Sequence, residues 1–374
     1  MEPRDLNRMF DALAPTPEQE QAGLDRLLQT ERKGKPMKKL KKLTVAAIAA
    51  ALMVISCAAA VVTGIDQRLL DYFGAGPEQA ELLAPGAVPV DVTVEDNGAT
   101  LRVTQVLMDR YSILILADFT APEGTVLDMD EENDGINRGF GGMEWSMPEL
   151  LNEAEEAIDL NQSWSWNTEV LDDGDPLDNH LTLLMRMELS EGIQPDWNIS
   201  GMSLHNNDLV RYDPQLCQYV TVYSGDWSCQ FPVTWQDMGQ IVRVNQVAGQ
   251  MDGVDISVTG LYLSPMTLQV KLERAEPVPL RSDDAKPGTY SRWISALNVD
   301  RVTLTTKDGQ AVPLIELGST GSDQDLDIAF RMEEITSLEQ FLGGTLTLRV
   351  GDGSVDIPLE GLSLMTVKEA RMLP

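Results

Sequence analysis

The sequence predicts a mainly β protein, with two tandem β-sandwich domains that follow one transmembrane helix and a short helical N-terminal tail. Three observations support this prediction. Residues 43–65 form an uncharged apolar run, the chain from residue 90 alternates between apolar and polar side chains, and one such segment recurs 155 residues later. With 374 residues, the chain is long enough for two or three domains.

Acidic residues are concentrated after the apolar run. Residues 1–42 contain 10 of the 28 Lys and Arg and 7 of the 59 Asp and Glu, and residues 43–65 contain none. This leaves 18 basic and 52 acidic residues, a net charge of −34, on residues 66–374. Such a region repels the phosphate backbone, so the composition excludes nucleic acid as its partner. Its recurring Val, Leu, Ile and Trp indicate a folded core beneath this acidic surface.

Residues 1–42 are predicted to be a cytoplasmic tail with two short amphipathic helices. The first carries one apolar stripe, and the second is capped by Thr16, with Pro17 at its first position and Gln19 completing a capping box. The stripes consist of Leu6, Met9, Phe10 and Leu13 in the first helix and Leu24, Leu27 and Leu28 in the second. So short a segment buries two stripes poorly, so we expect a protein partner to cover them. The alternatives are a loosely ordered, solvated tail or two helices that rest on the inner leaflet.

Residues 43–65 are long enough to cross a membrane, because about 20 apolar residues span the hydrocarbon core as a helix. The basic residues on their N-terminal flank are Arg32, Lys33, Lys35, Lys38, Lys39, Lys41 and Lys42. This flank predicts a cytoplasmic N-terminus, with residues 66–374 outside the cell. One alternative is a buried helix of a soluble protein. Another is a lipoprotein signal that starts at Met37 and is lipidated at Cys57.

A juxtamembrane linker is predicted at residues 66–89, with a short helix at 67–73 that ends before Gly74 and Pro77. From Val90 onward the hydrophobic period is two, and Asn97-Gly98 predicts a hairpin turn. Residues 111–119 are apolar enough to form a central strand.

The β region contains an internal repeat. GATLRVTQVLMDRYSILILA, from Gly98, aligns without a gap with GVDISVTGLYLSPMTLQVKL, from Gly253. A second match aligns the Arg-Met pair at 186–187 with the pair at 331–332. Two matches in the same order predict two β-sandwich domains, at 90–235 and 240–374. The first carries an insertion at 120–179 with a short helix at 147–158.

The sequence contains no catalytic constellation, so we expect neither an enzyme nor a cofactor. Its two histidines, His180 and His205, are expected at the surface. The acidic loop at 130–141 begins like an EF-hand but has Gly141 in place of the bidentate Glu at the last position. We therefore expect a solvated loop, with weak calcium binding there or at 172–175 as the alternative.

Two further groups of residues leave alternatives open. Trp145, Trp164 and Trp166 are expected to cover a sandwich core, although aromatic residues on loops also bind sugars or peptides. In the hairpin expected at 216–231, Cys229 would lie opposite Val222, several residues from Cys217. A disulfide is therefore permitted outside the cell but is not predicted by this register.

Three segments resemble a known family: FDALAPTPEQEQAGLDRLLQ in the tail, KKLKK with the apolar run, and VEDNGATLRVTQVLMDRYSILILADF from Val94. In these segments the chain resembles Gram-positive membrane proteins that contain the domain of unknown function 4179. The second β unit resembles the immunoglobulin-like domain that often follows it. Such proteins are regarded as anti-sigma-like. The resemblance implies that residues 5–31 hold a sigma factor at the membrane, while the outer domains sense an unknown extracellular ligand or act as a scaffold. A cell-envelope binding or structural protein with an incidental tail is the alternative.

Overall fold

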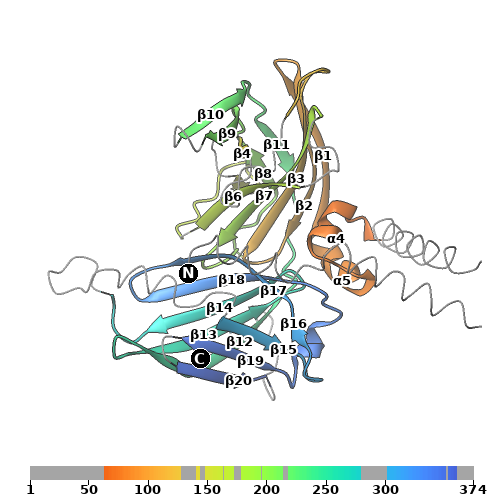
Figure 1. Cartoon of the computed structure of the whole chain (residues 1–374). Helices are drawn as coiled ribbons and strands as arrows, with labels where there is room; N and C mark the ends of the chain where they lie inside the picture. The colour runs from red at the N-terminus through yellow and green to blue at the C-terminus, as the bar shows by residue number, and fades with distance from the viewer. Residues whose placement is uncertain are drawn as a thin grey trace, which may run out of the picture. The chain divides into compact units, whose positions relative to one another are not determined.

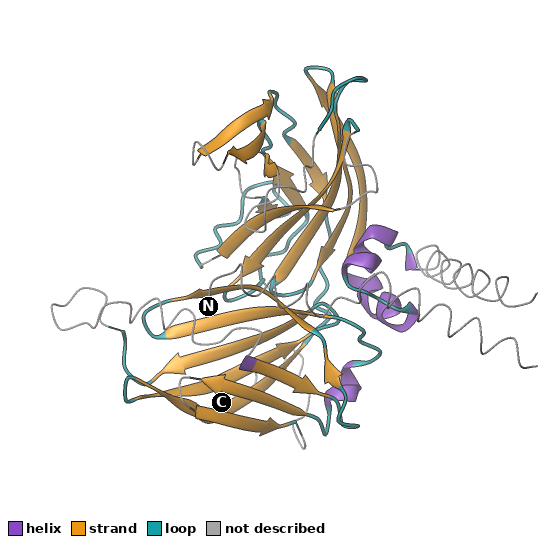
Figure 2. Ribbon diagram, viewed as in Figure 1, coloured by secondary structure: helices purple, strands orange, loops and turns teal. Residues whose placement is uncertain are grey.

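The computed structural model describes residues 63–127, 140–143, 148–162, 164–171, 178–194, 196–213, 218–278, 301–350 and 353–359. These residues belong to one compact unit. Strands make up most of its regular structure, and the mainly β prediction is confirmed (Figure 2). The predicted tail and nearly all of the predicted span lie outside the described residues, within which no helix has the length and apolarity to cross a membrane.

The first repeat, residues 87–233, is built on a five-stranded antiparallel sheet with the strand order β1-β2-β3-β7-β6 (Figure 1). Its strands are β1 (Ala87–Asp96), β2 (Ala99–Met108), β3 (Ser112–Thr120), β6 (Trp164–Leu171) and β7 (His180–Leu189). As predicted, β3 is central and is buried on both faces along most of its length. Asn97 and Gly98 turn the chain with φ of 49° and 80°, which suits a two-residue hairpin turn.

The second repeat, residues 240–359, contains a sheet with the equivalent order, β12-β13-β14-β18-β17. Its strands are β12 (Gln240–Met251), β13 (Val254–Leu263), β14 (Thr267–Arg274), β17 (Leu314–Gly321) and β18 (Asp325–Met332). The same irregularity occurs in both hairpins: the register shifts at Thr104 and again at Thr259. Each of these hydroxyls donates to a carbonyl of the next strand, at Leu116 and Lys271 respectively, also 155 positions apart. A duplication predicts this agreement in strand order, bulge and hydrogen bond.

The second sequence match was wrong by two residues. In the first sheet Ile113 pairs with Met187, whereas the equivalent Leu268 pairs with Phe330 rather than with Met332. Because side chains alternate with a period of two, a shift of two residues keeps every side chain on the same face. The apolar pattern therefore does not reveal such an error.

Each large sheet packs against smaller ones through an apolar core. In the second repeat the partner is a four-stranded sheet, β16-β15-β19-β20. In the first repeat there are two three-stranded sheets, β10-β9-β4 and β11-β8-β5. These strands are β4 (Phe140–Met143), β5 (Glu149–Leu151), β8 (Gly201–Leu204), β9 (Leu209–Asp213), β10 (Gln218–Tyr223), β11 (Cys229–Pro232), β15 (Val302–Thr305), β16 (Ala311–Val312), β19 (Thr345–Val350) and β20 (Gly353–Pro358).

Two local predictions were wrong. The helix expected at 147–158 is instead the short strand β5, followed by a turn in which Asn152 accepts hydrogen bonds from the backbone of Ala154 and Glu156. An Asn side chain that satisfies nearby backbone donors competes with helix formation. The hairpin expected at 216–231 does not form either, because β10 pairs with β9 and β11 pairs with β8. Cys229 is a free thiol.

Candidate functional site

The connector, residues 64–86, comprises the last two residues of the predicted membrane span and most of the linker predicted after it. It contains α4 (Gln67–Tyr72), α5 (Pro77–Leu83) and a 3-10 turn, η2 (Ala84–Gly86). Asp66 caps α4 by accepting the backbone N–H of Arg68 at 3.0 Å. At the other end Phe73 and Gly74 close the helix, and Gly74 has a φ of +57°. The helix expected at 67–73 is thus present, whereas α5 was missed because Pro77 starts a helix rather than ending one.

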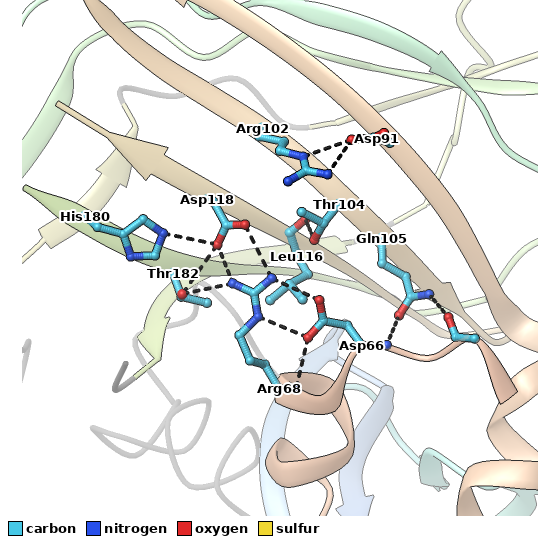
Figure 3. Close-up of polar contacts among 11 residues, drawn as sticks. Asp66, Arg68, Asp91, Arg102, Thr104, Gln105, Leu116, Asp118, His180 and Thr182 are labelled. Atoms are coloured by element: carbon cyan, nitrogen blue, oxygen red, sulfur yellow. Dashed lines mark hydrogen bonds and ion pairs between the residues drawn. The ribbon is translucent and has the colours of Figure 1, made fainter. Parts of the chain in front are cut away.

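The Arg68 guanidinium fixes the start of the connector to the first repeat (Figure 3). It forms ion pairs with Asp66 and with Asp118 of β3, and it donates to the Thr182 hydroxyl of β7 at 3.1 Å. Gln105 of β2 adds a second attachment, because its side chain accepts from the backbone of Asp66 at 2.7 Å and donates to the Gly64 carbonyl at 2.8 Å.

These contacts stabilise the charged forms of Arg68 and Asp66. The hydrogen bond with Asp66 raises the pKa of Arg68, although burial acts in the opposite direction. Burial alone would raise the pKa of Asp66, but the hydrogen bonds and charge of Arg68 outweigh it, and the net pKa of Asp66 is lowered. Both groups are therefore charged at neutral pH.

An apolar cluster lies beneath the connector. Residues of α4 and α5 pack there against the face of the first sheet that points away from its sandwich core. The cluster consists of Ile65, Leu69, Leu70, Phe73, Ala80, Leu83, Leu107, Leu114, Leu116, Leu184 and Met266, each at most 2% exposed. Burial of a large apolar side chain is worth roughly 1.5–3 kcal/mol, so the leucines and phenylalanine of this cluster contribute strongly to holding the connector. Ile65, the last residue of the predicted span, belongs to this cluster.

The connector also reaches the second repeat. Gln79 of α5 is 1% exposed and donates to the carbonyls of Pro265 and Met332, at 3.0 and 3.3 Å. Its carbonyl oxygen accepts the backbone N–H of Ile335 at 3.0 Å. One buried amide side chain thus satisfies three backbone groups of the second repeat. The connector therefore contacts both repeats.

Tyr72, on α4, lies between two arginines from different repeats. Its hydroxyl accepts from Nη1 of Arg186 at 3.3 Å. The guanidinium of Arg331 lies 3.9 Å from the ring centroid, within the range of a cation–π contact. Tyr72, Phe73, Ser112, Met266, Thr267 and Arg331 are among the residues that line a cavity of about 10 Å³ at this place. A space of this size is close to the lower limit for one water molecule.

The two repeats meet at equivalent turns, residues 109–112 and 264–267, which we call the joint. Asp109 accepts from the Ser264 hydroxyl at 2.5 Å, and the hydroxyls of Ser112 and Thr267 lie 3.1 Å apart. Both pairs join positions that are 155 residues apart. Contacts between equivalent positions are the signature of a two-fold interface. The joint therefore has the local pattern of a symmetric dimer contact within one chain.

Aromatic and small residues complete the joint. The rings of Tyr111 and Tyr262 meet edge to face, with centroids 4.7 Å apart. The Tyr262 hydroxyl accepts the backbone N–H of Arg110 and donates to Asp237. A Cβ added to Gly239 would lie 2.1 Å from the Tyr262 ring. Only glycine permits this close approach of the segment between the two repeats.

Three carboxyl groups are buried at or beside the joint. Burial raises the pKa of Asp109 to about 6, against hydrogen bonds from Ser264 and from the backbone of Tyr111 and Ser112. Burial raises the pKa of Glu188 to about 8, with only the Ser112 hydroxyl and the charge of Arg186 acting against it. Asp237 also has a raised pKa, mainly through burial. Buried carboxyls with raised pKa values can change charge near neutral pH.

Most of the residues predicted to act in binding lie outside the part of the chain that the structure describes. The tail stripes, the basic flank and Cys57 lie outside the described residues, as do Trp145, Cys217 and the acidic residues of both candidate calcium loops. Among the residues that are described, no group of three or more His, Cys, Asp or Glu is arranged to hold a metal ion.

Both histidines are described, as are Trp164 and Trp166. His205 is exposed, as expected, and lies 3.4 Å from Glu149. The side chain of His180 is 29% exposed, and its Nε2 lies 3.4 Å from Oδ1 of Asp118, beside Arg68. Trp166 packs against the first core, whereas Trp164 is 44% exposed. Of the two that the structure describes, the core prediction is confirmed for Trp166 and wrong for Trp164.

The sequence contained a signal for the connector site that went unused. Leu114 and Leu116 point away from the sandwich core, and their repeat equivalents are Gln269 and Lys271. A face that is apolar in one copy and polar in the other indicates that different surroundings cover the two copies, and Gln269 is indeed only 3% exposed. For Tyr72 and Gln79 the sequence carries no comparable signal.

No known protein family matches the chain, and no curated protein matches it. Among solved structures, the chain is similar to a conserved domain protein from Bacillus anthracis, with 12% identity over 73% of this chain and 92% of that chain and a TM-score of 0.40. It is also similar to the N-terminal periplasmic domain of ScsB from Proteus mirabilis, with 9% identity over 75% of this chain and 98% of that one and a TM-score of 0.18. At these TM-scores neither similarity carries an argument about fold or function.

Proposed function

We propose that this chain is a single-pass membrane signalling protein, anti-sigma-like, in which two immunoglobulin-like sandwiches outside the cell act through the connector on a cytoplasmic tail. The observation that supports this proposal best is the fixation of the connector. Residues 64–86 continue from the last two residues of the predicted span, and their contacts reach both repeats. A change at the joint would therefore act on the segment next to the membrane.

The proposed partner of the tail is a sigma factor. The stripes of Leu6, Met9, Phe10 and Leu13 and of Leu24, Leu27 and Leu28 supply the apolar contacts. A short free peptide does not recover its ordering entropy unaided, so the tail gains helix when it binds. An amphipathic helix that docks in a groove uses this i, i+3, i+4, i+7 spacing.

Capture of the partner from membranes in mild detergent tests the proposal. The full chain should retain a sigma factor, identified by mass spectrometry. Phe10→Asp or Leu27→Asp should abolish this capture, because the partner would desolvate a carboxylate without a counter-charge. Lys38→Ala, in the membrane flank, should capture as well as the parent chain does.

The opposite results support a different class of protein. If no sigma factor is captured, or if both aspartate variants bind as the parent does, the proposal fails. The chain is then better explained as a cell-envelope binding or structural protein, anchored by the span or by a lipid on Cys57.

A further inference from the structure

Arg186 of β7 connects three parts of the molecule. Its Nη1 donates to the Tyr72 hydroxyl of the connector at 3.3 Å, and its Nη2 donates to the Leu317 carbonyl of the second repeat at 2.9 Å. Its Nε faces Oε1 of Glu188, two residues along the same strand, at 3.7 Å. That distance is too long for a hydrogen bond. Arg186 thus uses its two terminal nitrogens on the connector and the second repeat, and leaves Glu188 only loosely paired.

Glu188 lies at the joint and is poorly solvated. Its side chain is 7% exposed, Oε2 accepts from the Ser112 hydroxyl at 2.5 Å, and Oε1 is buried without a hydrogen-bond partner. The Ser112 hydroxyl in turn lies 3.1 Å from that of Thr267, across the joint. A buried carboxylate with one hydrogen bond is costly, whereas a protonated carboxyl is not. The surroundings of Glu188 therefore favour its protonated, neutral form.

Among the residues that the structure describes, few other charges lie near Glu188. Asp109, in the turn between β2 and β3, disfavours its negative charge. Arg331 of β18 is paired with Glu333 at 2.8 Å, and Lys271 of β14 is paired with Asp327 at 3.2 Å. Arg186 is therefore the cation that an ionised Glu188 would attract.

We propose that Glu188 and Arg186 form a proton-dependent latch for the connector. While Glu188 is neutral, Arg186 holds Tyr72 and Leu317. When Glu188 loses its proton, the carboxylate draws the guanidinium to itself, because a charged acceptor outcompetes a phenol and a carbonyl. The connector then loses its Arg186 contact and opens more readily. That this opening reaches the tail rests on the proposed function; the latch itself does not.

The raised pKa of Glu188 determines how the stability of the closed joint depends on pH. Burial raises the pKa of Glu188 from 4.5 to about 8, so the closed joint binds a proton that the open one releases. The stabilisation is full below pH 4.5, declines as the pH rises, and is lost above about pH 8. Between pH 6.5 and pH 9, one such group increases the opening constant by up to about 30-fold.

Amide hydrogen exchange of the full chain in detergent micelles or nanodiscs tests the latch. Protection of α4, relative to the intrinsic exchange rate at each pH, should fall by up to about 30-fold between pH 6.5 and pH 9. Glu188→Gln, which keeps the shape of the neutral acid, should abolish this fall. Glu169→Gln, an exposed carboxyl on the neighbouring β6, should retain it.

A second variant, Tyr72→Phe, keeps the latch testable if Glu188→Gln does not fold. Tyr72→Phe removes only the hydroxyl that accepts from Arg186, and it should reduce the pH-dependent loss of protection while the repeats stay folded. The latch is refuted if the parent shows no loss, if the loss persists in Glu188→Gln, or if Tyr72→Phe shows the same loss as the parent. These results do not depend on sigma-factor capture, so the latch and the proposed function can fail separately.

Discussion

Replacement of Leu69 by alanine tests whether the apolar face of α4 holds the connector. The Leu69 side chain is 0% exposed and lies at the centre of the connector cluster. Removal of buried methyl groups from a leucine typically costs about 2–5 kcal/mol, through lost transfer free energy and the cavity left behind. The connector is a small element at one face of the sheet, so this cost should appear in its local opening rather than in global unfolding. The opening constant should rise roughly 30-fold or more.

Amide hydrogen exchange measures this effect directly. The amides of Leu70, Phe73 and Ala75 donate to carbonyls within the connector, so their protection reports whether α4 is closed. In Leu69→Ala these amides should exchange at least 30-fold faster, while the strands of both repeats keep their protection. Leu342→Ala, at a leucine that is 36% exposed, is the matched control. Unchanged protection of the connector in Leu69→Ala would refute the view that its apolar face anchors it.

Three further predictions concern the two cores and the joint. Trp227→Ala should lower the free energy of unfolding by about 3–5 kcal/mol, because this indole is fully buried and also donates to the Ala99 carbonyl. Trp164→Ala, at an exposed tryptophan, should change the free energy of unfolding by less than about 0.5 kcal/mol. Equal denaturant midpoints for the two variants would contradict this prediction. Gly239→Ala should destabilise the chain by about 1–3 kcal/mol through its clash with the Tyr262 ring, while Gly260→Ala, with nothing closer than 3.8 Å, is the control for added volume at a glycine. Burial raises the pKa of the Cys229 thiol to about 11, so alkylation of Cys229, followed by peptide mapping that separates it from Cys57 and Cys217, should be slow at pH 7 and accelerate up to about pH 11. Rapid alkylation of Cys229 at pH 7 would show that its thiol is not buried as described.

The sequence predicted the strands and their repetition well, for a physical reason. A strand that buries one face alternates with a period of two, and a turn such as Asn97-Gly98 requires residues that tolerate positive φ. Both signals are local. They recur at Asp252-Gly253, where φ is again positive at both positions, so the repeat was detectable without any knowledge of packing.

Register and long-range contacts were less predictable. The pairing of Leu268 with Phe330 instead of Met332 differs by one full period, which leaves the apolar pattern unchanged. Which strands β10 and β11 pair with depends on packing against the first core, and no local sequence pattern determines this packing.

The connector site was the least predictable part. Gln79 appears in the sequence as a polar residue of a linker, yet it is buried because three backbone groups of the second repeat satisfy its amide. Glu188 likewise resembles any surface glutamate of an acidic protein. Its burial follows from the meeting of two turns that are far apart in the chain.

Protease protection in intact protoplasts most directly tests the proposed topology, with an epitope placed before residue 1. Under conditions that fully digest the purified protein, external protease should degrade residues 66–374 and leave the epitope protected in the membrane fraction. Lysed protoplasts should lose both. Protection of residues 66–374 in intact protoplasts would contradict the proposed topology. Loss of the epitope from the membrane before protease is added would instead indicate cleavage ahead of Cys57.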